Sequence, residues 1–238
     1  MSCSEMPVKA VKPVSHVIFD NDGLLLNTEV LYEEAYNRLL KRYGKGEFTW
    51  EMKLRQMGRP QEIANQLVID EFKLPLSVDE VIAQTDAYLI EKFPSSQLMP
   101  GAERLVRHLH KYNVPMALCT AAKRKYFQLK TSQHEDLYRL FTHVVCIPEE
   151  PEIRHGKPSG ECYLTCASRF PDPAPSPSSV LVFEDSVNGV QAALNAGMQV
   201  VMVPDPRMAP ESRLSATQCL NSLLEFRPET FGLPAFQS

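Results

Sequence analysis

The sequence predicts an α/β fold: a doubly wound, Rossmann-type parallel sheet with an α-helical domain inserted after its first strand. Short runs of small and branched apolar residues alternate with stretches of helical spacing, which is the pattern of parallel strands and their crossover helices. One long interval, residues 31–97, breaks this alternation because it contains amphipathic helical spacing and no strand-like run. The interval therefore predicts a separate helical body.

Length and composition fit an ordinary globular protein of this kind. The 238 residues are enough for one large domain, or for a core with a smaller inserted one, and 44% are hydrophobic and 23% charged. A formal net charge of −4 gives no reason to expect a nucleic acid polymer as partner. Because no apolar run approaches membrane-spanning length and the first residues are polar, we expect a cytoplasmic protein without membrane contact. Nothing argues against a monomer.

The predicted elements follow from these patterns in chain order. The strand-like runs are residues 17–19, 115–120, 143–147, 180–183 and 199–203. The helical stretches of the insert are residues 32–43, 60–72 and 78–93. Pro100 and Gly101 then end the insert before a helix over residues 102–110. We therefore assign residues 1–30 and 98–238 to the core and residues 31–97 to the insert.

An aspartate pair, Asp20 and Asp22, directly follows the first strand and precedes Gly23. Ligand chemistry in open α/β sheets lies just beyond the carboxyl ends of the strands. Two neighbouring carboxylates are costly there unless they share a cation or one of them is protonated, so the pair indicates a metal site or an acid/base pair. Taken alone, the Asp-Asn-Asp-Gly sequence is equally typical of a turn.

Three more polar signals follow later strands. Thr120 ends the second strand, where a helix-cap role is the ordinary alternative. Lys157 lies between Gly156 and Pro158, and its ordinary alternative is a solvated surface lysine. Glu184 and Asp185 follow the buried strand 180–183; packing explains such an acidic pair poorly, whereas a magnesium ion prefers carboxylate oxygens.

Inside the insert, Gly58 and Arg59 precede a predicted helix. A basic residue beside glycine at a helix N-terminus suits an anionic ligand, although an arginine at a loop tip is often only solvated. Phe48 and Trp50, earlier in the insert, are interpreted as packing residues.

In chain order, Asp-x-Asp-Gly, a strand-end Thr, Lys-Pro and Glu-Asp-x-x-x-Gly resemble the motifs of the haloacid dehalogenase superfamily, in the branch with a helical cap after the first motif. The resemblance covers nearly the whole chain and implies a phosphomonoesterase. Four further segments are similar to members that act on pseudouridine 5′-phosphate, which implies a nucleoside 5′-monophosphate of this kind as substrate. These segments are residues 22–26, 98–103, 197–205 and 231–234.

The resemblance also implies a role for each motif residue. Asp20 is the nucleophile that forms an aspartyl phosphate, and Asp22 is the general acid and base. Thr120 and Lys157 bind the phosphoryl oxygens. Gly58 and Arg59 of the cap are the candidate substrate-binding residues outside the core.

The implied cofactor is Mg²⁺. Asp20, Asp185 and the main-chain carbonyl of Asp22 are the implied ligands, with Glu184 assisting nearby. The metal offsets charge that otherwise repels the nucleophile from phosphate.

Several residues depart from the family pattern. Asn21 replaces a more usual apolar residue, Asn27 an aspartate before the cap, and Ala121 a serine. After Lys157-Pro158, the sequence Ser159-Gly160-Glu161 lacks an aspartate that orients the lysine. A sugar phosphate phosphatase or phosphomutase is an alternative function, because a phosphomutase shares all of these core residues. A non-catalytic binding protein that keeps the fold is a further alternative, because of the departures near the phosphate-binding residues.

Overall fold

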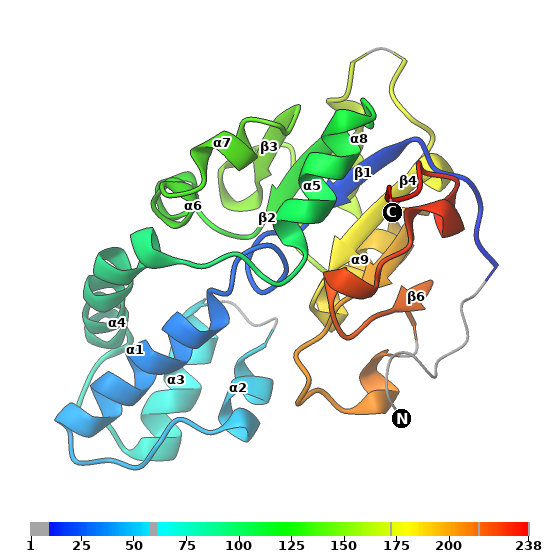
Figure 1. The fold of residues 1–238 in the computed structure, drawn as a ribbon. Helices are drawn as coiled ribbons and strands as arrows, with labels where there is room; N and C mark the ends of the chain where they lie inside the picture. Colours follow the sequence, from blue (N-terminus) through cyan, green and yellow to red (C-terminus); the bar gives the residue numbers. More distant parts are fainter. Residues whose placement is uncertain (1–9, 58–60, 172, 214, 238) are drawn as a thin grey trace.

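A six-stranded sheet forms the centre of the protein, in the order β3-β2-β1-β4-β5-β6 (Figure 1). The computed structural model describes residues 10–57, 61–171, 173–213 and 215–237. All five neighbouring strand pairs are parallel, and the strand order reverses beside β1, as in a doubly wound sheet. The predicted fold class is therefore confirmed. The strands are β1 (His16–Phe19), β2 (Met116–Thr120), β3 (His143–Cys146), β4 (Val180–Glu184), β5 (Gln199–Met202) and β6 (Gln218–Cys219).

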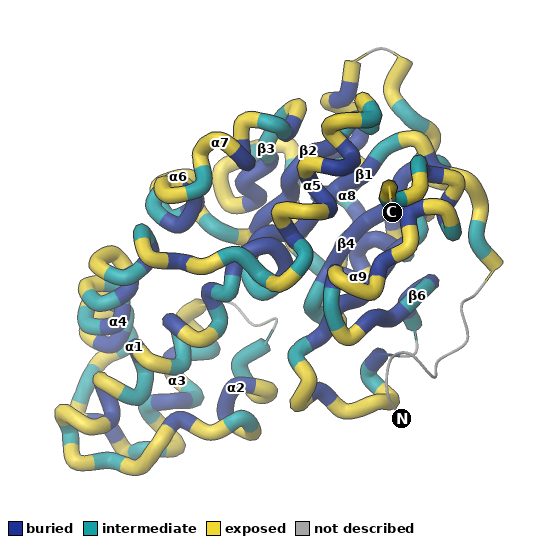
Figure 2. The backbone as a smooth tube through the Cα atoms, in the orientation of Figure 1, coloured by how far each residue is buried: buried dark blue, intermediate teal, exposed yellow. Residues whose placement is uncertain are grey.

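Helices cover both faces of the sheet. Alternate residues of β1 point to opposite sides: Val17 and Phe19 belong to one apolar cluster and Ile18 to the other. The first cluster includes residues of α5 (Ala102–Lys111), α6 (Arg124–Thr131) and α7 (Glu135–Tyr138). The second includes residues of α8 (Glu161–Ser168) and α9 (Val187–Asn195). Because both faces are covered, β2 and β4 are buried along their whole length (Figure 2).

The insert is a helical cap with an apolar cluster of its own. It contains α1 (Glu29–Arg42), α2 (Trp50–Gln56), α3 (Gln61–Phe72) and α4 (Val78–Lys92), followed by the short 3₁₀ helix η2 (Phe93–Ser95). The helices predicted over residues 32–43, 60–72 and 78–93 correspond to α1, α3 and α4. Phe48 is buried in the cap cluster, whereas partly buried Trp50 packs against the cluster of α8 and α9.

The two chain crossings between core and cap are hydrogen-bonded to each other. The Asn27 amide donates to the Gln97 carbonyl at 2.8 Å, and the Met99 amide donates to the Leu25 carbonyl at 2.8 Å. The two linkers therefore form one paired hinge. The boundaries at residues 31 and 97 stay a prediction; α1 itself begins at Glu29.

Helix α2 and strand β6 were not among the predicted elements. None of the described helices combines the length and apolar character needed to cross a membrane.

Candidate active site

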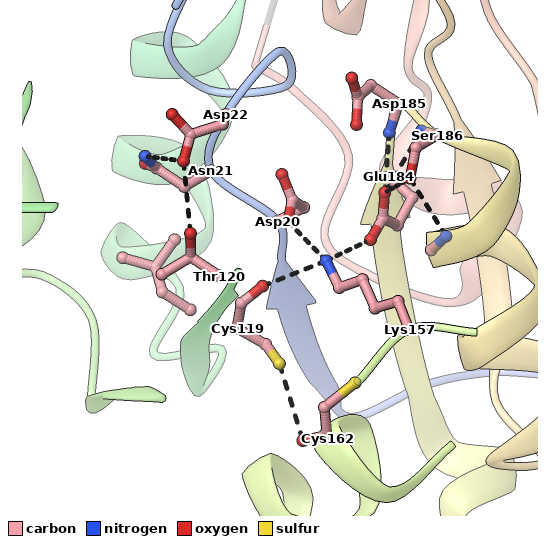
Figure 3. A network of polar contacts seen from close by, with 12 residues as sticks. Asp20, Asn21, Asp22, Cys119, Thr120, Lys157, Cys162, Glu184, Asp185 and Ser186 are labelled. Atoms are coloured by element: carbon pink, nitrogen blue, oxygen red, sulfur yellow. Dashed lines mark hydrogen bonds and ion pairs between the residues drawn. The ribbon is translucent and has the colours of Figure 1, made fainter. Parts of the chain in front are cut away.

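The predicted core residues meet at the carboxyl edge of the three central strands (Figure 3). Asp20 follows β1, Thr120 ends β2, and Glu184 and Asp185 lie at the end of β4. Lys157 comes from the loop before α8 and reaches in between β1 and β4 (Figure 3). Parallel pairing of β1 with both β2 and β4 brings these distant positions together.

Lys157 is a buried cation between two carboxylates. Its Nζ donates to Asp20 Oδ1 at 2.5 Å and to Glu184 Oε1 at 2.6 Å, with the Cys119 carbonyl at 3.4 Å. Burial alone would lower the pKa of Lys157, but the charges of Asp20 and Glu184 raise it well above its ordinary value. The ammonium is therefore a permanent positive charge at this edge.

Glu184 is completely buried, and both of its oxygens already accept hydrogen bonds. Oε1 accepts from Lys157 and from the Tyr163 hydroxyl at 2.5 Å, and Oε2 accepts from the Asp185 amide at 3.1 Å and from the amide and hydroxyl of Ser186. A Cβ on Gly189 would lie 1.9 Å from this carboxylate, so only glycine leaves room for it. Glu184 is thus placed to orient Lys157 and has no oxygen left unpaired.

Asp20, Glu184 and Asp185 form an acidic cluster with carboxylate oxygens within 4.8 Å of one another. Burial, partly offset by Lys157, raises the pKa of Asp20 to about 7. Burial and the Asp20 charge raise the pKa of Asp185 well above its ordinary range. Clustered, desolvated carboxylates of this kind fit a hard divalent cation. Gly23, at φ +85°, gives Asp185 its space, because a Cβ there would lie 2.2 Å from Asp185 Oδ2.

The Asp22 carboxylate lies apart from this acidic cluster. Its Oδ1 accepts from Thr28 Oγ1 at 2.8 Å and from Lys130 Nζ at 2.5 Å, and its Oδ2 accepts from Thr120 Oγ1 at 3.3 Å. Burial would raise the pKa of Asp22, but the Lys130 charge and these hydrogen bonds lower it overall. The Asp22 side chain is thus ready to act as a base and must take up a proton before it can act as an acid. Because this carboxylate lies apart from the acidic cluster, the predicted contribution of Asp22 to a metal site is limited to its main-chain carbonyl.

Two departures from the family pattern have a visible structural role. Asn21 is buried, and its Oδ1 accepts from the Tyr138 hydroxyl at 2.6 Å, so a polar residue has a partner there. Glu161 accepts from the amides of Arg154 and His155 at 2.8 and 3.1 Å. This carboxylate orders the loop before Lys157 from the position where the family pattern has its aspartate.

The sequence analysis did not identify Lys130 as a site residue, and its predictions for Gly58 and Arg59 are not tested by the structure. Gly58 and Arg59 lie outside the described residues, so their predicted contact with substrate stays a prediction. Lys130 is 1% exposed although lysines on a helix are usually solvated. One signal was available: Lys130 follows Phe127 by three residues and therefore shares its buried helix face.

The sheet, the helical cap and the buried acidic edge together define an α/β fold with an inserted helical cap. The chain belongs to the haloacid dehalogenase-like hydrolases, because the model of that family matches residues 14–197.

Similar proteins give the reaction class. The protein of Drosophila melanogaster named probable pseudouridine-5′-phosphatase is 48% identical over 97% of this chain and 99% of its own. The protein of Arabidopsis thaliana named (DL)-glycerol-3-phosphatase 1, mitochondrial, is 46% identical over 94% of this chain and 75% of its own. The protein is therefore a phosphatase of this family.

A solved structure supports the fold. A haloacid dehalogenase family hydrolase from Deinococcus radiodurans superimposes with a TM-score of 0.75, covering 92% of this chain and 95% of its own. At 24% sequence identity this likeness concerns the fold alone.

Proposed function

We propose that the protein is a Mg²⁺-dependent phosphomonoesterase that hydrolyses pseudouridine 5′-phosphate through an aspartyl phosphate. The central observation is the contact of Lys157 with Asp20: Lys157 Nζ lies 2.5 Å from Asp20 Oδ1. The Asp185 carboxylate belongs to the same acidic cluster. This arrangement supports the proposal, because a candidate nucleophile, a fixed positive charge and a candidate cation site lie together at one edge of the sheet.

In the first half-reaction, a carboxylate oxygen of Asp20 attacks the phosphorus atom and the bond from phosphorus to the sugar oxygen breaks. Asp22 donates a proton to that oxygen, so the nucleoside leaves as an alcohol. Lys157 and Thr120 bind the phosphoryl oxygens and stabilise the charge that develops on them.

In the second half-reaction, water attacks phosphorus and the bond to Asp20 breaks. Asp22, now ionised, accepts a proton from this water, and inorganic phosphate is released. One carboxyl group thus serves as acid and then as base, and the enzyme returns to its starting state.

Asp20 and Asp185, with the Asp22 carbonyl, would bind the Mg²⁺ ion. When bound, the ion supplies positive charge that offsets repulsion between the nucleophile and the phosphate. Glu184 contributes through Lys157, because its own oxygens are occupied.

The 48% identity with a protein named for pseudouridine-5′-phosphatase activity over nearly the whole chain supports the nucleotide substrate. The second candidate is glycerol 3-phosphate, favoured by the 46% identity with a protein named for that activity. Selection between them belongs to the cap, and Arg59 stays our candidate contact there. We also expect a cytoplasmic monomer.

The proposal is tested with a panel of phosphomonoesters assayed for phosphate release with and without magnesium. The panel contains pseudouridine 5′-phosphate, uridine 5′-phosphate, glycerol 3-phosphate and a hexose phosphate. We expect the highest kcat/KM for pseudouridine 5′-phosphate and no phosphate release without a divalent cation. A higher value for glycerol 3-phosphate would favour the second candidate, and a need for a bisphosphate activator would indicate a phosphomutase. No turnover of any ester would contradict the proposed reaction.

A further inference from the structure

Lys130 joins three parts of the molecule at one buried point. Its side chain is 1% exposed, and Nζ donates to Asp22 Oδ1 at 2.5 Å and to the Tyr32 hydroxyl at 3.0 Å. The same Nζ lies 4.5 Å from the centre of the Phe93 ring. Lys130 belongs to core helix α6, Tyr32 to cap helix α1, and Phe93 to η2 at the cap exit. A single ammonium group therefore contacts the core, the cap and the catalytic motif.

The contacts of Asp22 are unequal at its two oxygens. Oδ1 accepts short bonds from Lys130 at 2.5 Å and Thr28 at 2.8 Å. Oδ2 accepts long ones from Thr120 at 3.3 Å and Asn21 at 3.5 Å, on the side that faces the strand ends (Figure 3). Since short, charge-assisted bonds are the stronger ones, Oδ1 is fixed and Oδ2 is the oxygen available for proton transfer.

Burial makes the pair of Lys130 and Asp22 interdependent. An ammonium group removed from water is costly without an opposite charge, and the same holds for the carboxylate. We therefore expect Lys130 Nζ to keep its hydrogen bond to Asp22 Oδ1 wherever the Lys130 side chain can reach it from α6. Among the described contacts, Tyr32 has no hydrogen bond to Asp22, but its hydroxyl accepts one from Lys130. A displacement of α1, which carries Tyr32, would therefore change the position of Asp22 through Lys130.

We propose that Lys130 is a positioning residue that fixes the orientation of the Asp22 carboxylate and, through Tyr32, links that orientation to the position of the cap. This inference rests on the proposed function, because it assigns proton transfer to Asp22. In the first half-reaction Oδ2 delivers its proton to the leaving oxygen as the phosphorus–oxygen bond breaks. In the second, Oδ2 takes a proton from the attacking water. Without Lys130 the carboxylate rotates and both transfers become slower.

The leaving group separates this role from a general structural one. p-Nitrophenolate leaves without a proton, so formation of the aspartyl phosphate from p-nitrophenyl phosphate does not need Asp22, whereas its hydrolysis does. An alkyl ester such as pseudouridine 5′-phosphate or glycerol 3-phosphate needs Asp22 in both steps. We therefore compare the unaltered protein, Lys130→Met, Lys130→Arg and the exposed control Lys125→Met from the same helix, all with magnesium.

For Lys130→Met we expect steady-state turnover of both esters to fall about 100-fold, within the range of general acid–base catalysis. With the aryl ester a rapid burst of one nitrophenolate per protein molecule should precede the slow phase. Lys130→Arg should regain most of the turnover, and Lys125→Met should behave as the unaltered protein. Slow turnover without a burst would mean that attack by Asp20 is impaired, and would overturn the inference. Unchanged turnover would overturn it as well.

The link to the cap is tested with Tyr32→Phe, alone and combined with Lys130→Met. Tyr32→Phe should slow alkyl ester turnover severalfold and have no further effect in the Lys130→Met background, since both act on one network. Additive effects would contradict the link. If Lys130→Met does not fold, Lys130→Gln replaces it, because its amide can still donate to Asp22 without the charge. Absence of turnover by the unaltered protein would overturn the proposed function, whereas the outcomes above overturn only the role of Lys130.

Discussion

At the carboxyl edge of the sheet, three carboxyl groups, those of Asp20, Glu184 and Asp185, lie around one buried ammonium group, that of Lys157. Lys157 contacts Asp20 and Glu184, while the Asp185 side chain adds negative charge to the same cluster. The surplus of negative charge favours a cation, and the raised pKa of Asp20, about 7, reflects burial in this environment. Each substitution in the cluster therefore changes charge balance as well as chemistry.

Asp20→Asn tests the nucleophile. The amide cannot form the aspartyl phosphate, so turnover should fall to background. The same change removes a charge that is destabilised by burial, so without metal the melting temperature should be equal to or above that of the unaltered protein. Phosphate release and thermal unfolding in chelator measure the two effects. Retained turnover in the purified variant would refute the covalent mechanism.

Lys157→Ala tests the buried cation. Its loss should lower kcat by two to three orders of magnitude, roughly the effect of removing one transition-state charge donor. It should also lower the free energy of unfolding by about 3–5 kcal/mol, because Glu184 stays buried without its cation. Kinetics and urea unfolding give both values, with the exposed Lys125→Ala as control. A rate loss below about tenfold would assign Lys157 a structural role only.

At the scale of elements, the strand ends were predictable and the helix interiors were not. Apolar runs mark buried parallel strands, so the placement of Asp20, Thr120 and Glu184 at one edge followed from the sequence. The burial of Lys130 was not predictable, because it depends on contacts with Asp22 and Tyr32, which lie far away in sequence. Long-range pairing of this kind leaves only a weak local pattern.

Helix α2 and strand β6 were missed because their residues show no clear periodicity. The strand β6 contains only Gln218 and Cys219 and exists through its pairing with β5, so it has too few residues to show alternation. Helix α2 has seven residues, and its Lys53 is buried by ion pairs with Glu29 and Glu33 of α1. A charged residue at a buried position weakens the apolar periodicity from which a helix is predicted.

Gly189, in the first turn of α9, leads to a prediction. In Gly189→Ala the new Cβ would meet the Glu184 carboxylate at 1.9 Å, so Glu184 must move and Lys157 with it. We expect kcat to fall at least tenfold and stability to fall by about 1–3 kcal/mol, as for overpacked cores. Gly46→Ala is the matched control, because nothing lies within 4 Å of its added Cβ. Equal effects of the two substitutions would contradict this account.

At the scale of the whole molecule, side-chain contacts other than the backbone pairing of the hinge join cap and core. The Tyr126 hydroxyl of α6 donates to Asp86 of α4 at 2.5 Å. Arg207, after β5, donates to Glu33 of α1 at 2.7 Å and lies over the Trp50 ring at 4.3 Å. These contacts stabilise the position of the cap over the acidic edge.

Arg207→Ala should weaken this closed position. Because Arg207 is 45% exposed, an ion pair of this kind contributes only about 0.2–1 kcal/mol, which corresponds to a rise in KM of up to about fivefold with little change in kcat. The effect should shrink at high salt, which screens the pair in the unaltered protein. Steady-state kinetics at low and high salt measure this, with the exposed Arg227→Ala as control. A fall in kcat at constant KM would place Arg207 in the chemistry instead.

The proposed Mg²⁺ would compete with protons for the acidic edge, so stability should depend on pH differently with and without magnesium. In the folded protein the pKa of Asp20 is raised from 3.8 to about 7, so the folded state binds more protons than the unfolded state between these values. Without metal, the contribution of Asp20 to stability should therefore decrease as pH rises through this window and then level off above about pH 7. A divalent cation requires both carboxylates ionised, so its binding strengthens over the same window.

The increase in melting temperature caused by a fixed magnesium concentration should accordingly be larger at about pH 8 than at about pH 6. Asp185→Asn should abolish most of this increase at both pH values, because it removes a ligand that the cation needs. Exposed Glu211→Gln should leave the increase unchanged. The measurement is thermal unfolding with magnesium or chelator at each pH. An increase that is independent of pH, or that persists in Asp185→Asn, would mean that magnesium binds elsewhere on the protein.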